Sequence, residues 1–285
     1  MADFLPATIE SVLSQDYTRI EYIIMDGGST DGTIELLKKY DGRLRYITSR
    51  DGGPADAIDR GFAQAKGDIL AWLNSDDTYE PGAVRSAAEF LMAHPEIDVA
   101  YGEGYWIDES GVRIGQYPTK QFDASALKAD CFICQPAAFI RSRAYRDCKL
   151  DPGLTLSFDY DLWIRMAAQR HRFAFIPQHL ANSRMHSHCK TLEQREAVFQ
   201  VSMDLLRRHY GYIPFAWVLS YATFRIDGRD QFFEPFRPSL LKYLASLPVG
   251  LWYNSAKPFR YFGEWFSVGL NSAIRRLRGA STSQP

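Results

Sequence analysis

The sequence predicts an α/β fold, with a Rossmann-like, mostly parallel sheet flanked by helices over residues 1–210 and a helical C-terminal extension over residues 211–285. Through residues 4–104, short apolar runs typical of buried strands alternate with amphipathic helical patterns. Two of these runs end in acidic side chains, and beyond Gly211 the composition shifts to aromatic residues and proline. Such alternation favours parallel strands joined by right-handed crossovers.

The first half of the chain carries the alternating pattern most clearly. Lys38 and Lys39 suit the last turn of a helix, where cations are favoured by the dipole, and Pro81 suits a first turn. The pattern opens on a helix with no strand before it. Helices are expected over residues 4–15, 33–40, 55–65 and 81–93, and strands over residues 20–25, 44–48, 69–73 and 99–101.

From residue 105 the alternation gives way to a mixed pattern. A hairpin is expected around residues 109–111, where Glu-Ser-Gly interrupts an apolar run. A buried strand over residues 132–140 is interrupted by Pro136. Further elements are a helix over residues 158–169, a strand over 173–176 and a long helix over 191–210.

Composition narrows the class of protein. With 46% hydrophobic and 24% charged residues, the chain is an ordinary globular one, and a net charge of -1 argues against general nucleic-acid binding. Cys131 and Cys134 form a lone C-x-x-C pair, so we expect free thiols. No secretory signal opens the chain and no apolar run reaches about 18 residues, which predicts a cytoplasmic location.

The stretch DGGSTDGT follows the first predicted strand, at the edge of the sheet where α/β proteins bind ligands. Gly27 and Gly28 would let the backbone approach a ligand closely, and Asp26 could reach ribose, base or metal. The alternative is a tight turn in which Thr30 or Thr33 caps the next helix.

A second acidic cluster, Asp76-Asp77, ends the strand ILAWLN. Adjacent carboxylates repel each other unless a cation or donor groups neutralise them. Hard oxygen ligands of this kind suit Mg²⁺ or Mn²⁺ held jointly with substrate phosphates. The alternative is that the pair caps the helix that begins near Pro81.

Two further groups could carry chemistry. Asp159 and Asp161 lie in the first turn of a predicted helix, where acids complement the dipole, but their aromatic neighbours also describe a partly desolvated general base. In RMHSHCKT, His186 could complete a metal shell and Lys190 could neutralise phosphate.

These four motifs, in this order and spacing, resemble the family 2 glycosyltransferases of the GT-A fold. The resemblance covers residues 4–192 and makes residues 1–104 the nucleotide-sugar half and residues 105–210 the acceptor half. It implies that Asp76 lies near the ribose, that Asp77 binds the metal together with His186, and that Asp159 is the catalytic base. Substrate contacts are further expected from Asp26, Gly27, Gly28, Ser29, Asp56, Asp161 and Lys190.

The resemblance implies an inverting, metal-dependent transfer of one sugar from a nucleotide-diphospho-sugar, expected to be a UDP-sugar, to a hydroxyl of a glycan or lipid-linked acceptor in cell-surface polysaccharide synthesis. The cofactor implied is Mn²⁺ or Mg²⁺. Gly27 stands where many members carry a second acid, which leaves the base contact open. Members usually begin with a strand that this sequence lacks, so we expect a late start or a truncated chain that binds donor poorly. Two alternatives stay open: a non-catalytic sugar-nucleotide-binding protein and a nucleotidyltransferase.

The C-terminal extension is basic and aromatic. From Lys242 onward it holds six basic residues against one acid, Glu264, interleaved with aromatic residues. That mixture suits a surface resting on anionic lipid headgroups at the inner face of the cell membrane. The alternative is an appendage packed on the domain with its basic residues solvated.

Overall fold

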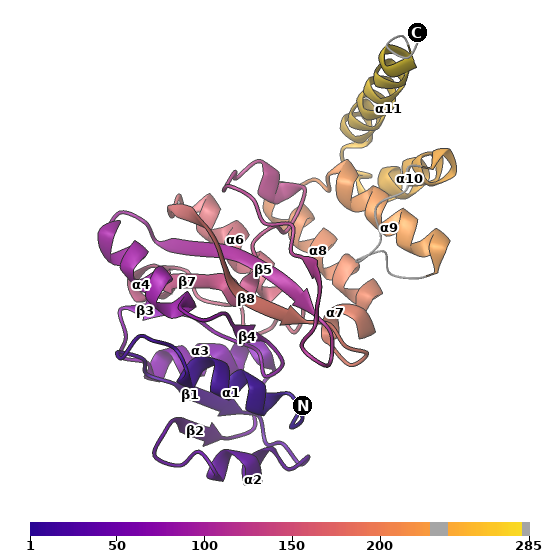
Figure 1. Ribbon diagram of the computed structural model, residues 1–285. Coiled ribbons are helices and arrows are strands. Elements are labelled where there is room, and N and C mark those ends of the chain that lie inside the picture. The colour runs from indigo at the N-terminus through magenta and orange to yellow at the C-terminus, as the bar shows by residue number, and fades with distance from the viewer. Residues whose placement is uncertain (229–238, 281–285) are drawn as a thin grey trace. The chain divides into compact units, whose positions relative to one another are not determined.

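The computed structural model describes residues 1–228 and 239–280, and for residues 273 and 275–280 the backbone alone (Figure 1). It divides into two compact units. The first comprises Met1–Leu127 and Cys131–Gln194, and the second Lys128–Asp130 and Arg195–Pro285. In the described part of the chain, none of the helices combines the length and the hydropathy that a membrane span needs.

The first unit contains two sheets. The smaller pairs β1 (Ile23–Asp26) with β2 (Arg45–Thr48) in parallel. The larger has the strand order β3-β7-β5-β8-β4, with β6 paired to β5. Its strands are β3 (Ile69–Leu70), β4 (Thr78–Tyr79), β5 (Val99–Ile107), β6 (Arg113–Gln116), β7 (Ala138–Arg141) and β8 (Phe173–Arg184).

The prediction of a mostly parallel sheet is wrong for the larger sheet, which is mixed. Only β5 and β8 run parallel there, from the pair Val99 and Phe173 onward, while the other pairings are antiparallel. The turn between β5 and β6 is short, and strands joined by so short a connection pair antiparallel. The hairpin predicted around residues 109–111 is confirmed by this pairing.

β5 and β8 are much longer than predicted. Their parallel pairing continues through Gly104 and Asn182, where the sequence no longer reads as an apolar run. A Cβ on Gly102 would lie 2.4 Å from the Leu180 side chain, and one on Gly104 2.4 Å from the Cys134 sulfur. These glycines therefore let β5 pack where larger residues would not fit.

Helices and short 3₁₀ turns flank the sheets. Pro occupies the first turn of α1 and of α3, where its missing N–H is not needed. In α1, Leu5, Ile9 and Val12 are buried on one face, and α1 confirms the helix predicted over residues 4–15. The helices of this unit are α1 (Leu5–Leu13), α2 (Thr33–Lys38), α3 (Pro54–Gln64), α4 (Ala83–Ala93), α5 (Ser142–Asp147), α6 (Phe158–Ala168) and α7 (Lys190–Glu193). The 3₁₀ turns are η1 (Ala126–Lys128), whose last residue belongs to the second unit, and η2 (Gln135–Ala137), which precedes β7.

The second unit is helical over its described residues. It contains α8 (Arg195–Tyr210), α9 (Phe215–Asp227), α10 (Leu240–Tyr253) and α11 (Pro258–Ala280). Phe199 and Met203 of α8 share a core with Val218 of α9 and Tyr261 of α11. The units therefore divide at Gln194, before the boundary predicted between residues 210 and 211. The split of the first domain at residue 104 stays a prediction.

Candidate active site

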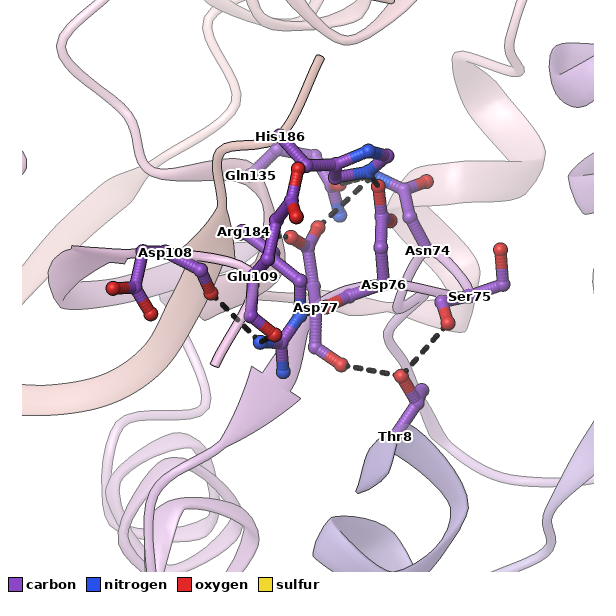
Figure 2. Close-up of polar contacts among 10 residues, drawn as sticks. All are labelled: Thr8, Asn74, Ser75, Asp76, Asp77, Asp108, Glu109, Gln135, Arg184 and His186. Atoms are coloured by element: carbon purple, nitrogen blue, oxygen red, sulfur yellow. Dashed lines mark hydrogen bonds and ion pairs between the residues drawn. The ribbon is translucent and has the colours of Figure 1, made fainter. Parts of the chain in front are cut away.

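The turn that joins β3 to β4 lies at the centre of the candidate site (Figure 2). Asp77 is only 3% exposed, and both of its carboxylate oxygens accept hydrogen bonds. The backbone N–H of Arg184 donates to Oδ1 at 2.9 Å, and the Asn74 amide donates to Oδ2 at 3.1 Å. The Thr8 hydroxyl of α1 lies 2.8 Å from the Asp77 carbonyl and 3.0 Å from the Ser75 carbonyl. The turn is thus held from two sides.

Burial raises the pKa of the Asp77 carboxyl well above its usual range, and the neighbouring Asp76 carboxylate raises it further. The hydrogen bonds from Arg184 and Asn74 act in the opposite direction. Because its side chain is buried and each oxygen already accepts a hydrogen bond inside the protein, Asp77 is less accessible to an external ligand than Asp76.

Asp76 lies in a different environment. Its side chain is 14% exposed, and its Oδ2 lies 3.0 Å from Nε2 of His186, which follows the end of β8. The His186 ring is buried and packs against the Phe4 ring, with 4.6 Å between centroids. The structure therefore brings His186 to Asp76, whereas the sequence had paired His186 with Asp77, and it leaves Asp76 the more accessible of the two adjacent acids.

Arg184 is a site residue that the sequence did not single out. Its Nε donates to the Asp76 carbonyl at 2.8 Å, and its Nη1 donates to the carbonyls of Asp108 and Glu109 at 2.8 and 3.0 Å. The guanidinium also lies over the Phe4 ring, 5.1 Å from its centroid. Arg184 therefore ties the β3–β4 turn to the β5–β6 hairpin (Figure 2).

Replacing Arg184 by methionine is expected to lower the free energy of unfolding by about 2–5 kcal/mol, because buried carbonyls lose a charged donor. Urea unfolding would measure the change. Arg113→Met is the matched control, since Arg113 forms an ion pair with Glu80 at the surface, and its loss should cost less than about 1 kcal/mol. Equal costs for the two variants would contradict this role for Arg184.

The DGGSTDGT loop folds around Asp26. The Asp26 side chain is buried, and its Oδ2 accepts hydrogen bonds from the backbone N–H groups of Gly28 at 3.0 Å and Ser29 at 3.2 Å. Gly28 has φ +95°, a conformation that favours glycine. Asp31, not Thr30 or Thr33, bonds the start of the next helix, through the N–H of Thr33 at 3.2 Å. The loop is a closed turn around the Asp26 carboxylate, and its residues 27–32 are exposed.

A second D-G-G, at residues 51–53, lies against the first. A Cβ on Gly27 would approach Oδ2 of Asp51 to 2.8 Å, so the Asp51 carboxylate occupies the space beside Gly27. Desolvation lowers the pKa of Lys190, and the nearby Asp51 carboxylate opposes that shift. Asp51 therefore lies beside the DGGSTDGT loop and acts electrostatically on Lys190. The repeated D-G-G was the signal in the sequence that could have identified it.

The Asp56 side chain of α3 contacts residues that are close to it in the chain. Its Oδ2 accepts the backbone N–H of Gly52 at 2.8 Å and pairs with Arg60 at 2.8 Å. These contacts shape the loop before α3, and the substrate contact expected of Asp56 stays a prediction.

The two acids of α6 have separate surroundings. Desolvation raises the pKa of Asp159 above its usual range, although nearby backbone N–H groups act against the shift. Asp161 is almost fully buried and pairs with Arg165, with 2.7 Å between Oδ2 and Nε. Ser157, just before α6, has φ +53°. Non-glycine residues adopt that conformation rarely, and often at functional sites.

Asp159 and Asp77 both act electrostatically on the buried Cys134 thiol. The carboxylates of both residues add to the rise that burial causes in the pKa of the Cys134 thiol. The structure thus joins Asp76 to His186, with Asp77 next to Asp76 in the chain, and it holds Asp161 in an ion pair of its own. Among the described residues, no group of three His, Cys, Asp or Glu side chains is arranged as a metal site.

Sequence comparison identifies relatives of the chain. The model of the family Glycosyl transferase family 2 matches residues 2–148, about half of the chain. An uncharacterized glycosyltransferase of Methanocaldococcus jannaschii is 24% identical over 73% of this chain and 74% of its own length. Another, from Rickettsia typhi, is 27% identical over 58% of this chain and 54% of its own length. Putative glycosyltransferase EpsE of Bacillus subtilis is 29% identical over 56% and 61%.

Solved structures share the fold. The S. aureus TarS 1-349 structure in complex with UDP has a TM-score of 0.59 at 17% identity and covers 92% of this chain and 79% of its own. Mannosyltransferase PcManGT from Pyrobaculum calidifontis, in complex with GDP-Man and Mn²⁺, has a TM-score of 0.53 at 13% identity, covering 97% and 77%. The first unit, a mixed sheet flanked by helices, therefore has the GT-A fold. From the family match and the fold together, this chain belongs to glycosyl transferase family 2, and it is a glycosyltransferase.

Proposed function

We propose that the protein transfers a single sugar, with inversion, from a nucleotide-diphospho-sugar to an acceptor hydroxyl. The observation that carries this proposal is the contact of the partly exposed Asp76 with the buried His186, next to the buried Asp77. Asp77 and Asp159 both act on the pKa of the Cys134 thiol. An acid whose pKa is raised by burial is suited to accept a proton.

The donor is proposed to be a UDP-sugar. The exposed Lys190 side chain suits a nucleoside diphosphate, because an ammonium neutralises phosphate, and the glycines of the exposed DGGSTDGT loop let a ligand approach the backbone closely. TarS structures contain UDP and UDP-GlcNAc, whereas PcManGT contains GDP-Man, so the fold accommodates either base.

The metal is proposed to rest on Asp76 with His186, where the sequence had placed it on Asp77 with His186. Asp76, whose side chain is 14% exposed, offers a carboxylate of the kind that suits Mn²⁺ or Mg²⁺, and the His186 imidazole lies 3.0 Å from it. The donor diphosphate would supply the remaining ligands. When bound, the ion would offset the negative charge that grows on the departing nucleoside diphosphate.

Asp159 is proposed as the catalytic base. Its carboxylate removes the proton of the acceptor hydroxyl, and the oxygen attacks the anomeric carbon while the bond to the diphosphate oxygen breaks. The proton ends on Asp159 and the electron pair on the nucleoside diphosphate. One base without a nucleophilic carboxylate fits a single displacement, which inverts the anomeric centre. Asp161, bound to Arg165, is better suited to support α6 than to contact substrate.

The acceptor is proposed to be a glycan or a lipid-linked saccharide in cell-surface polysaccharide synthesis, at the inner face of the membrane. O-antigen biosynthesis protein RfbC of Myxococcus xanthus is 25% identical over 64% of this chain, although the match spans only 15% of that protein. The name of that relative supports a role for this chain in making surface polysaccharide.

A panel of nucleotide sugars, incubated with the protein and Mn²⁺, tests the proposal. We expect release of a nucleoside diphosphate, fastest from a UDP-sugar, even without acceptor, because water can replace the hydroxyl. Release of pyrophosphate from a nucleoside triphosphate would indicate a nucleotidyltransferase instead. Binding of a donor without any turnover, with or without candidate acceptors, would indicate a non-catalytic sugar-nucleotide-binding protein.

A further inference from the structure

α11 carries a stripe of large apolar side chains that nothing in the described chain covers. The residues recur at helical spacing on one face, and Phe259 at the start of the stripe is 90% exposed. The C-terminal part of α11 extends past α9 and α10 (Figure 1). The stripe consists of Phe259, Phe262, Phe266, Leu270 and Ile274, all exposed.

The opposite face of α11 is fixed to the second unit. Tyr261 is fully buried, and its hydroxyl donates to the Ser246 carbonyl at 3.0 Å. Trp265 stacks on Tyr243 with 4.5 Å between centroids, and its indole N–H donates to the Tyr243 carbonyl at 3.0 Å. α11 is therefore held in an orientation that leaves the stripe outward.

α10 adds a second exposed apolar row. Leu241, Leu244, Pro248 and Trp252 recur at helical spacing, and Trp252 is 80% exposed. α10 is locked against α11, because Gly250 lies so close to the Tyr261 ring that a Cβ would overlap it. Exposed apolar surface of this extent on adjoining helices marks an interaction surface, here called the α10–α11 surface.

The charge around this surface is positive. Glu264, the one acidic residue after Lys242 in the sequence, turns inward, where it accepts the Tyr212 hydroxyl and the backbone N–H of Phe215. Lys257 and Arg260 are exposed, at the start of α11. The rest of the chain holds more acidic than basic residues, so the positive charge is concentrated in this segment.

We propose that the α10–α11 surface docks on the headgroup and acyl boundary of an anionic phospholipid bilayer. Phe and Trp side chains enter the boundary, while lysine and arginine attract anionic headgroups. A second copy of the chain fits less well, because a self-complementary contact would bring two cationic surfaces together. The inference concerns the second unit and is independent of the donor and metal assignments.

Co-sedimentation of the full chain with vesicles tests the proposal. The chain is expected to sediment with vesicles that contain phosphatidylglycerol and much less with pure phosphatidylcholine. The combined variant Phe259→Ser, Phe262→Ser and Phe266→Ser should lower the partition coefficient about 100-fold or more, because each phenyl ring buries apolar area in the bilayer. The variant Lys257→Glu and Arg260→Glu should lower it about tenfold for phosphatidylglycerol vesicles.

The matched control is Val112→Ser with Ile114→Ser, which removes two exposed apolar side chains from the first unit and should sediment as the unaltered chain does. Far-ultraviolet circular dichroism spectra and urea unfolding midpoints, equal in all variants, verify that they are folded. Sedimentation of the triple-Ser variant at the unaltered level would overturn the proposal. Failure of the unaltered chain to sediment with phosphatidylglycerol vesicles would also overturn it. If that chain instead formed a dimer that the triple-Ser variant dissociates, the α10–α11 surface would be an interface between two copies.

Discussion

Replacing Asp159 by asparagine is expected to lower the rate of sugar transfer by about 100- to 10,000-fold. The amide cannot accept the proton of the acceptor hydroxyl, although it matches the carboxylate in shape. Donor affinity should change little, because the proposed donor contacts lie on the DGGSTDGT loop, Asp76 and Lys190 and not on Asp159. Steady-state transfer and calorimetric donor titration would measure the two effects.

The pH profile gives a second measure of the same role. Burial raises the pKa of Asp159, and the base must be ionised to act, so kcat/KM should rise with pH through a value above the usual aspartate range. This limb should vanish in Asp159→Asn. The folded chain also holds that proton more tightly than the unfolded chain does. The contribution of Asp159 to stability therefore falls as pH rises from the usual aspartate pKa to the raised one.

Asp161→Asn is the matched control on the same helix. It weakens the buried ion pair with Arg165, so the free energy of unfolding should fall, while the acid limb of the pH profile should stay. Transfer at the unaltered rate by Asp159→Asn, or loss of the limb in Asp161→Asn, would show that the base is assigned to the wrong residue.

Asp76→Asn is expected to weaken the binding of Mn²⁺, in the presence of UDP, by about 100-fold or more, since even partners of metal ligands contribute up to about that factor. The accessible carboxylate is the one that can meet an ion together with a diphosphate. Asp77→Asn should instead lower the free energy of unfolding by about 1–3 kcal/mol, because its amide would face the Asn74 amide that now donates to it.

Calorimetric titration of Mn²⁺ into chelator-treated protein, alongside urea unfolding, separates the two residues. Gln135→Ala is a useful control, because Gln135 contacts Asn74 and the Trp72 carbonyl but neither acid directly. It should affect stability and leave metal affinity near its original value. If Asp77→Asn lost the metal and Asp76→Asn kept it, Asp77 would be the metal ligand, as the sequence predicted.

Much of the fold follows from local pattern. The helical stripe of Leu5, Ile9 and Val12, the strand before Asp26 and the turn around residues 109–111 are encoded within a few residues, because side-chain period and turn chemistry are local properties. Motif order along the chain was sufficient to identify the family and the GT-A fold. The long β5–β8 pairing was missed, since it depends on glycines of β5 that make room for Leu180 of β8 and for Cys134.

The sequence by itself determined which residue types are present for the chemistry: adjacent acids after a strand, an acid in a helical first turn and a histidine beyond. Only the tertiary structure decided how they divide the work. Asp76 and Asp77 are neighbours in the chain, yet one is partly exposed beside the buried His186 and the other accepts a hydrogen bond from the backbone of Arg184, 107 positions away. Burial and hydrogen-bond partners depend on such distant residues, and they set which carboxylate stays accessible.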